Sequence, residues 1–268
     1  MRNQKAEKLR DNNYYTLAHK GSLDLNHPSM KKLLKLCEDS NFILDMGCGE
    51  GTRINLILAT INTSPQAYGI DVNKLAIEKA RKQYPKINFT KGNLEKLPFK
   101  DNFFDLVYSA YVFEHLMNPE TVMEEARRVL KPKGMLVIIA PNFGSPNRRS
   151  PNSKEKKINK LIKGFLSDLI NLNKKNISNL NWTKVEPRSE IYTIDSDTTT
   201  EPYLNTLILY TKQNFKINYF SSFWDQDRLS LFQLVFKILG LLKIYPFYLW
   251  GPHLMVVLEK NEKYVPSL

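Results

Sequence analysis

The sequence has few cysteines and no long uninterrupted apolar run. Only Cys37 and Cys48 occur in 268 residues, so a disulfide framework is not indicated and a reducing compartment is the simplest setting. The polar first residues, MRNQKAEKLRDNN, lack the apolar core of a signal peptide. No window is long and apolar enough to span a bilayer. We therefore expect a cytoplasmic protein.

Acidic residues are also scarce relative to basic ones. The chain has 39 Lys and Arg against 27 Asp and Glu, which gives a net charge of +12. Such a charge suits nucleic acid, an anionic membrane surface or an anionic substrate as partner. Lys and Asn are abundant throughout, so a general compositional bias explains the charge equally well. Both explanations stay open.

Three glycines at alternate positions mark a candidate ligand site. They lie in residues 43–51, ILDMGCGEG, after a short apolar run and an acid. The apolar run predicts the end of a buried strand, and the residues from Thr52 predict a helix. Because glycine lacks a Cβ, the backbone of Gly47, Gly49 and Gly51 can approach a ligand closely. A strand, a glycine turn and a helix N-terminus predict a nucleotide-type site at the carboxyl edge of a parallel sheet.

Short apolar strands alternate with helical patterns through the first half of the chain. The predicted strands are 42–45, 68–72, 87–90, 104–109 and 135–140, and the predicted helices are 52–60, 74–83 and 120–130. This alternation predicts an α/β fold with a doubly wound parallel sheet. After Pro141 the alternation stops; we expect helices near 156–172, 201–215 and 228–243, and strands at 216–222 and 254–260.

The residues around the glycine turn exclude two common phosphate sites. A Walker loop needs a lysine after its last glycine, but Thr52 and Arg53 follow Gly51. The dinucleotide fingerprint is G-x-G-x-x-G, and here the third glycine comes one residue early. Asp45 would repel a phosphate, whereas it suits an ammonium group.

Two further strand ends complete the outline of the ligand. Asp71 ends the second predicted strand, where its carboxylate can accept both hydrogen bonds of a ribose diol. Asn93 can bind an adenine edge, and Leu94 can pack on the ring. The predicted ligand is cationic, contains ribose and adenine, and lacks phosphate. S-adenosylmethionine fits this description.

The chain resembles the class I S-adenosylmethionine-dependent methyltransferases, and among them the small-molecule group that includes ubiquinone-type and sugar O-methyltransferases. The similar segments are ILDMGCGEG, GIDVN, GNLEKLPF, FFDLVYSAYVFEHL and RVLKPKGMLVIIAPN, in that order, within residues 40–142. The resemblance implies a mostly parallel seven-stranded sheet whose seventh strand is antiparallel. It also implies a set of cofactor-binding residues: Asp45, Gly47, Cys48, Gly49, Gly51, Asp71, Val72, Asn93, Leu94 and Ser109. Cys48 is expected to be a small filler rather than a nucleophile.

The residues after the fourth predicted strand are the candidates for catalysis. An oxygen acceptor benefits from a base near the methyl group. The candidates are His115, the first choice, with Glu114 and Tyr111. The alternative is a structural Glu-His pair, which the family carries regardless of substrate. Tyr111 stands where metal-dependent relatives have an extra acid, so we expect no metal.

Basic and aromatic residues outside the core are the candidates for substrate binding. Arg148 and Arg149 follow the fifth predicted strand, and their guanidinium groups suit a phosphate or carboxylate; a plain surface loop is the alternative. His19 and Tyr192 are weaker candidates. The PNFGSPNRRSP and DSDTTTEPYLNTL segments look similar to a subset of the family found with surface-glycan and lipid-linked sugar biosynthesis.

The nearly continuous apolar stretch 228–250 needs a second hydrophobic partner. Its Tyr and Trp residues beside an apolar helix with lysines suit a membrane interface. The alternatives that we favour are a homodimer interface and packing under the cap.

The four segments that we expect are an N-terminal helical arm or lid, the S-adenosylmethionine-binding core, a helical, basic cap insertion that contacts the substrate, and the C-terminal part of the core sheet with the apolar helix. Their ranges are 1–41, 42–142, 143–200 and 201–268.

The expected function is methyl transfer to a small molecule, with a sugar or a glycan or lipid-linked precursor as acceptor. RNA or DNA methylation is a rival, although no [ND]-P-P-[YF] motif and no appended nucleic-acid module are present. A non-catalytic S-adenosylmethionine-binding protein is the other rival.

Overall fold

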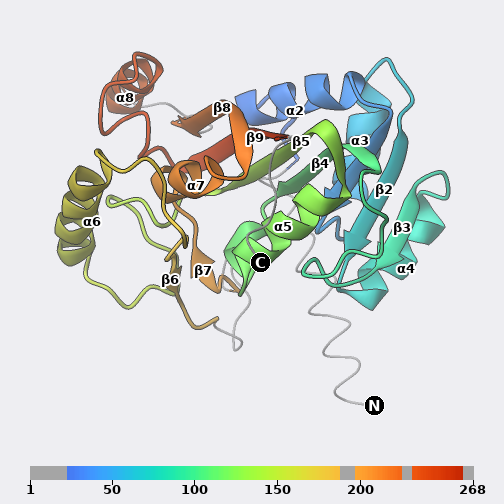
Figure 1. Cartoon of the computed structure of the whole chain (residues 1–268), viewed down its shortest axis with the longest axis horizontal. Coiled ribbons are helices and arrows are strands. Elements are labelled where there is room, and N and C mark those ends of the chain that lie inside the picture. Colours follow the sequence, from blue (N-terminus) through green and yellow to red (C-terminus); the bar gives the residue numbers. More distant parts are fainter. Residues whose placement is uncertain (1–22, 188–196, 225–230, 262–268) are drawn as a thin grey trace.

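The computed structural model describes residues 23–187, 197–224 and 231–261. They form a seven-stranded sheet in the order β3-β2-β1-β4-β5-β9-β8 (Figure 1). The strands are β1 (Phe42–Met46), β2 (Gln66–Asp71), β3 (Asn88–Lys91), β4 (Phe104–Ala110), β5 (Leu130–Pro141), β8 (Phe215–Phe223) and β9 (His253–Lys260). Only β9 runs antiparallel to its neighbours β5 and β8. The prediction of a mostly parallel seven-stranded sheet with one antiparallel strand is therefore confirmed.

Helices cover both faces of the sheet. They are α2 (Pro28–Glu38), α3 (Thr52–Thr60), α4 (Lys74–Gln83), α5 (Pro119–Val129), α6 (Lys157–Asn171), α7 (Leu204–Thr211) and α8 (Leu231–Leu241), with the short 3-10 helix η1 (Phe113–His115) after β4. Helices α2, α3 and α4 pack on one face and α5 and α7 on the other. The molecule is thus a three-layer α/β/α sandwich.

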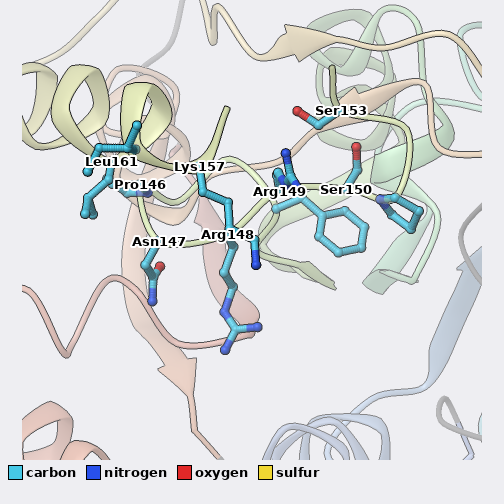
Figure 2. A pocket seen from close by; sticks show the side chains of 11 residues that line it. Pro146, Asn147, Arg148, Arg149, Ser150, Ser153, Lys157 and Leu161 are labelled. Carbon is cyan, nitrogen blue, oxygen red and sulfur yellow. The ribbon is translucent and has the colours of Figure 1, made fainter. Parts of the chain in front are cut away.

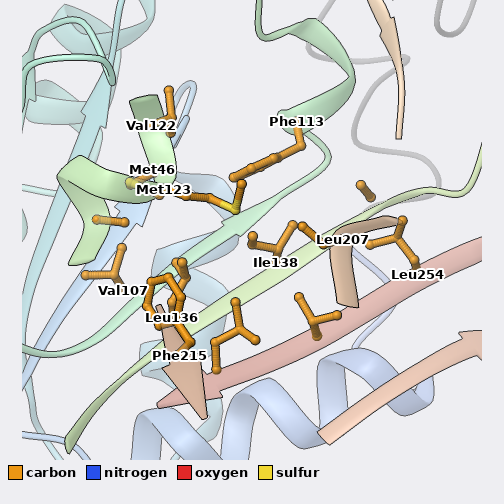
Figure 3. Packing of buried hydrophobic residues seen from close by; sticks show 14 of the residues in the cluster. Met46, Val107, Phe113, Val122, Met123, Leu136, Ile138, Leu207, Phe215 and Leu254 are labelled. Carbon is orange, nitrogen blue, oxygen red and sulfur yellow. The ribbon is translucent and has the colours of Figure 1, made fainter. Parts of the chain in front are cut away.

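The central strands are apolar on both sides because both of their faces are covered. In β5, Leu136 and Ile138 join the cluster under α5 and α7, whereas Val137 and Ile139 join the cluster under α2 and α3. Figure 3 shows Leu136 and Ile138 among the side chains of the first cluster. The alternation fixes the register, and it aligns the carboxyl ends of β1, β2 and β4 at one edge.

Local sequence signals account for several helix starts. Asn73 caps α4 by accepting hydrogen bonds from the backbone N–H groups of Leu75 and Ala76. Pro28 opens α2 and Pro119 opens α5, positions where the missing N–H costs nothing.

The region after β5 differs in detail from the prediction. A two-stranded antiparallel sheet, β6 (Thr183–Lys184) with β7 (Thr200–Glu201), lies where no regular structure was expected. The helix predicted over 201–215 is shorter and spans Leu204–Thr211. Of the apolar stretch 228–250, α8 has no buried residue, whereas Leu249 and Trp250 are buried and Trp250 donates to Asp168 of α6. Packing against the predicted cap is therefore confined to the end of this stretch.

Helix α6 matches its predicted range, but its apolar side faces outward. Its buried residues are Lys160, Asp168 and Asn171. Periodicity locates the apolar side of a helix, and in most proteins that side is buried. Here a buried polar network holds the opposite side instead. No helix among the described residues is long and apolar enough to cross a bilayer.

Candidate active site

The glycine turn follows β1 directly and is held in a conformation that other residues rarely adopt. The φ angles of Gly47, Gly49 and Gly51 are 79°, 53° and 77°. A Cβ on Gly47 would lie 2.4 Å from Cγ2 of Val112, and one on Gly51 would lie 2.4 Å from Cζ of Phe89. The turn is therefore a close-fitting backbone cradle at the carboxyl edge of the sheet.

Asp45 is the last but one residue of β1 and is completely buried. Its carboxylate oxygens have no well-formed hydrogen bond within the described residues, and the equally buried Tyr108 hydroxyl is the donor close enough to lower the pKa of Asp45. Burial raises the pKa of Asp45 to about 6, against the opposing effect of nearby Arg53. One hydroxyl donor leaves most of the lone pairs of a buried carboxylate unsatisfied, which is costly, so a cationic hydrogen-bond donor fits this position.

Asp71 lies beside the glycine turn at the end of β2. Its Oδ2 accepts a hydrogen bond of 2.9 Å from the backbone N–H of Gly49, and its Oδ1 accepts one of 2.8 Å from Asn73. Burial raises the pKa of Asp71, and these two backbone donors act in the opposite direction. Each oxygen keeps a second lone pair, so the carboxylate can still accept from a diol.

Of the other predicted cofactor-binding residues, two are exposed and three are buried. Val72 is 70% exposed and Asn93 is exposed, so both are open to a ligand. Leu94 is buried in the core, and Ser109 is buried with its hydroxyl donating to the carbonyl of Met46. Cys48 is buried against Gly69, and burial raises its thiol pKa well above the usual value, which suits a filler.

The predicted catalytic residues follow β4. Tyr111 has a positive φ of 59°, uncommon for a tyrosine, and its ring lies 5.9 Å from that of His253. In η1 the imidazole of His115 lies between two carboxylates. Its Nε2 is 3.8 Å from Glu114 and its Nδ1 is 3.5 Å from Asp197. Glu114 is itself buried, and the backbone N–H of Thr199 donates to its carbonyl oxygen. The strand-end loop is thus held under the segment that leads into β7.

Arg148 and two histidines lie at the same edge, where β9 begins beside the end of β5; with Trp224 we call them the cationic cluster, after the charge of Arg148. The guanidinium of Arg148 lies 5.9 Å from the ring centre of Trp224, and its buried Nε has no hydrogen-bond acceptor within the described residues. His253 pairs with Pro141 in the sheet, and its ring lies 6.0 Å from that of His27. Burial lowers the pKa of His253 to about 4, with smaller contributions from His27 and Arg148. Burial likewise lowers the pKa of Arg148.

A cavity of about 840 Å³ adjoins this cluster. Arg148, Arg149, Ser150 and Lys157 line it together with apolar residues of α6 (Figure 2). Arg149 is tied to its own loop, because its Nη1 donates to the carbonyl of Glu155. Of the two predicted arginines, Arg148 therefore has the freer guanidinium.

Sequence reasoning missed His253, Trp224 and His27 in this cluster. The available signal is topological, because an antiparallel strand begins at the edge where its parallel neighbours end. His19 and Tyr192 lie outside the described residues. Within the described ranges, no group of three or more His, Cys, Asp and Glu is placed to hold a metal ion; the expectation of a metal-free site remains a prediction.

Comparison with known proteins shows that the core of the sheet is similar to a methyltransferase domain. The family model of the methyltransferase domain matches residues 44–138. A probable S-adenosylmethionine-dependent methyltransferase of Mycolicibacterium smegmatis is 33% identical over 111 residues, which are 41% of this chain and 42% of the relative. The chain spans less than half the length of this curated relative, so the similarity concerns the domain and not the whole protein.

Solved structures share the fold at low identity. The S-adenosylmethionine-dependent methyltransferase from Mesorhizobium loti superimposes with a TM-score of 0.53 at 16% identity, covering 88% of this chain and 100% of that chain. A chain of the solved complex that contains the Trm112 methyltransferase activator of Haloferax volcanii gives a TM-score of 0.56 at 16% identity, with 97% of each chain covered. The matched region, 44–138, contains the glycine cradle, Asp45 and Asp71. This chain therefore carries a class I S-adenosylmethionine-dependent methyltransferase domain in a Rossmann-like fold, and the cofactor of that family is S-adenosylmethionine.

Proposed function

We propose that the protein transfers a methyl group from S-adenosylmethionine to an anionic small molecule, by O-methylation of a sugar or of a glycan or lipid-linked precursor. The observation that carries the proposal is the glycine cradle with a carboxylate on each side. The buried carboxylate of Asp45 has no donor other than the Tyr108 hydroxyl, and Oδ2 of Asp71 lies 2.9 Å from the backbone N of Gly49. The wider family resemblance supports this reading, and the acceptor is inferred from the cationic cluster.

The residues around the cradle fit the chemical groups of S-adenosylmethionine. Asp45 would satisfy its buried carboxylate with the ammonium group of the methionine part. Asp71 would accept from the ribose hydroxyl groups with its remaining lone pairs. The exposed Val72 and Asn93 follow β2 and β3, where an adenine ring would lie.

The reactivity comes from the cofactor, and the protein contributes alignment, exclusion of water and a base. S-adenosylmethionine supplies a methyl group that is activated by its positively charged sulfur. The chain must hold the acceptor in line, exclude water and accept the proton of an acceptor hydroxyl group. Tyr111 is the candidate that lies between the cradle and the cationic cluster, since Val112 packs on Gly47 and the Tyr111 ring contacts His253. His115 and Glu114 remain candidates for the base.

The anionic character of the acceptor follows from Arg148 and His253. A partly buried guanidinium favours an anion, and the buried Nε of Arg148 has no hydrogen-bond acceptor within the described residues. His253 is neutral at pH 7, because its pKa lies near 4, and its buried Nδ1 has no hydrogen-bond partner in the described part of the chain. A phosphate or carboxylate on the acceptor would pair with Arg148 and hydrogen-bond to His253.

The proposal is tested by substituting Asp71 and measuring both binding and methyl transfer. Asp71→Asn keeps the shape of the side chain but removes the charge, so we expect S-adenosylmethionine affinity to fall roughly tenfold or more. Calorimetry measures the affinity, and thermal unfolding checks that the fold is kept. An unchanged affinity would contradict the assignment of Asp71 to the ribose.

A labelled-methyl assay on cell extract identifies the acceptor class. We expect label in the lipid or glycan fraction. Label in nucleic acid would establish RNA or DNA methylation instead. Cofactor binding without transfer to any fraction would establish a non-catalytic S-adenosylmethionine-binding protein.

A further inference from the structure

Exposed apolar side chains concentrate on two helices of the described structure. Outside these helices, large exposed apolar residues among the described residues are confined to Val72, Leu75 and Met117. The remainder lie on or just after α6 and α8: Ile158, Ile162, Phe165, Leu166, Leu169, Ile170, Leu172, Leu231, Phe232, Leu234, Val235, Ile238, Leu241, Leu242 and Ile244. We call these residues the apolar surface. Apolar side chains gathered in this way mark an interaction site on a folded protein.

The outward orientation of α6 is fixed by its opposite side. Lys160 donates to Glu201 and to the carbonyl of Phe143, and Glu201 is 1% exposed. Asp168 accepts hydrogen bonds from four side chains: Tyr203, Trp250, Asn205 and Tyr245. Because these groups are buried and paired, rolling α6 to bury its apolar side would break the whole network. The exposure of the apolar side is therefore built into the fold.

Helix α6 contacts the segment that follows α8 at one end of the molecule. The rings of Phe165 in α6 and Tyr245, just after α8, lie 6.2 Å apart. Phe236 holds α8 to the body through Trp224 and through a stacked contact with Phe247. Figure 1 shows both helices at the end away from β3 and α4. The apolar surface therefore has two parts, one on α6 and one on α8, which are linked by the contact between Phe165 and Tyr245.

Basic residues surround the apolar surface and exposed acids are absent from its helices. The exposed lysines around α6 are Lys156, Lys157, Lys163, Lys174 and Lys175, and Lys243 follows α8. Asp168, the single acid between residues 156 and 175, is buried, and residues 231–258 contain no acid. The nearest acids along the sequence are Glu155, which pairs with Lys163, and Asp225 and Asp227, which precede α8. A second copy of the chain would bring like charges together, which disfavours a homodimer through this surface. An apolar surface with a lysine border matches an anionic bilayer interface.

We propose that α6 and α8 together dock the protein on an anionic lipid membrane, lying in the interface without crossing it. The apolar side chains would enter the boundary between headgroups and acyl chains, and the lysines would contact anionic headgroups. Docking can be measured without methyl transfer, because none of the fifteen apolar residues belongs to the glycine cradle, and Ile158 alone among them lines the cavity beside Arg148.

Vesicle sedimentation with the full chain tests the docking. The probes are vesicles of phosphatidylcholine alone and vesicles that also contain phosphatidylglycerol. The test variant is Leu166→Asn/Ile170→Asn/Leu231→Asn/Leu241→Asn, whose four positions are at least half exposed, so the fold should be kept. We expect the wild type to bind the anionic vesicles and the variant to bind about tenfold or more weakly.

Two controls make the result specific. Leu75→Asn/Met117→Asn removes exposed apolar side chains elsewhere and should bind vesicles like the wild type. Lys163→Gln/Lys174→Gln/Lys175→Gln should weaken binding and reduce the preference for phosphatidylglycerol. Absence of wild-type binding, or equal binding by the four-residue variant, would overturn the proposal. A wild-type dimer in light scattering that the four-residue variant dissociates would assign the surface to self-association instead. Calorimetry with S-adenosylmethionine, run in parallel, separates failure of docking from failure of the proposed function.

Discussion

Arg148 is the residue whose surroundings say most about the acceptor. Its guanidinium is packed on Trp224 with a buried Nε that lacks an acceptor, and it lines the cavity beside α6. We propose that Arg148 binds an anion on the acceptor, because its partial desolvation is offset only by the ring of Trp224 within the described residues.

Arg148→Gln should therefore reduce methylation of anionic acceptors while leaving S-adenosylmethionine affinity unchanged. We expect KM for such an acceptor to rise about tenfold to a hundredfold, the range for a lost charge-assisted bidentate contact. Arg148→Lys should restore only part of the effect, since lysine offers a point charge instead of a planar fork. The measurement is a labelled-methyl assay with the products separated by anion exchange.

Lys86→Gln supplies the matched control, because Lys86 is an exposed basic residue near β3 at the other end of the sheet. It should leave the product profile unaltered. If Arg148→Gln also gave the wild-type profile, the assignment of an anionic acceptor to this cluster would be wrong.

At the scale of elements, α6 depends on one buried ion pair. Glu201 of β7 accepts from Lys160 and also from the backbone and hydroxyl of Ser150. Burial lowers the pKa of Lys160, and Glu201 acts in the opposite direction by favouring the charged amine. Removing the carboxylate would leave a buried ammonium group without its counter-charge.

Glu201→Gln should consequently destabilise the protein by about 3–5 kcal/mol, the cost of breaking a buried pair from one side. The double variant Lys160→Met/Glu201→Gln should regain much of that loss, because the amide can still accept from Ser150 and no charge stays buried. Chemical denaturation measures both free energies of unfolding. A single variant as stable as the wild type, or a double variant no better than the single one, would refute the role of this pair.

The elements that the sequence predicts well are those governed by local rules. The glycine turn, the strands of the first half and the start of α4 at Asn73 follow from apolar runs, glycine spacing and capping. The direction in which α6 faces could not be predicted, since it depends on Glu201 and Trp250, far away in sequence. His253 was missed for a similar reason, because only the pairing of β9 with β5 brings it to the site.

At the scale of the whole molecule, the cavity lined by Arg148 and the apolar surface share helix α6. Lys157, Ile158 and Leu161 of α6 line the cavity that also contains Arg148. A membrane contact through α6 would therefore place the cavity beside the lipid headgroups. This arrangement suits an acceptor whose anionic headgroup lies at the bilayer surface and whose lipid part remains in the bilayer.

Because α6 belongs to both the cavity and the apolar surface, we expect docking to control access to the acceptor. The methyl-transfer step itself should not change. Leu166→Asn/Ile170→Asn/Leu231→Asn/Leu241→Asn should transfer about tenfold less label to intact membranes than the wild type, in line with its weaker docking. After the same membranes are dispersed in detergent, both proteins should label the acceptor equally, because diffusion then replaces docking. The measurement is labelled methyl in the lipid fraction at equal cofactor saturation. If both proteins labelled intact membranes equally, or if label appeared only in water-soluble products, the apolar surface would have no role in bringing the enzyme to its acceptor.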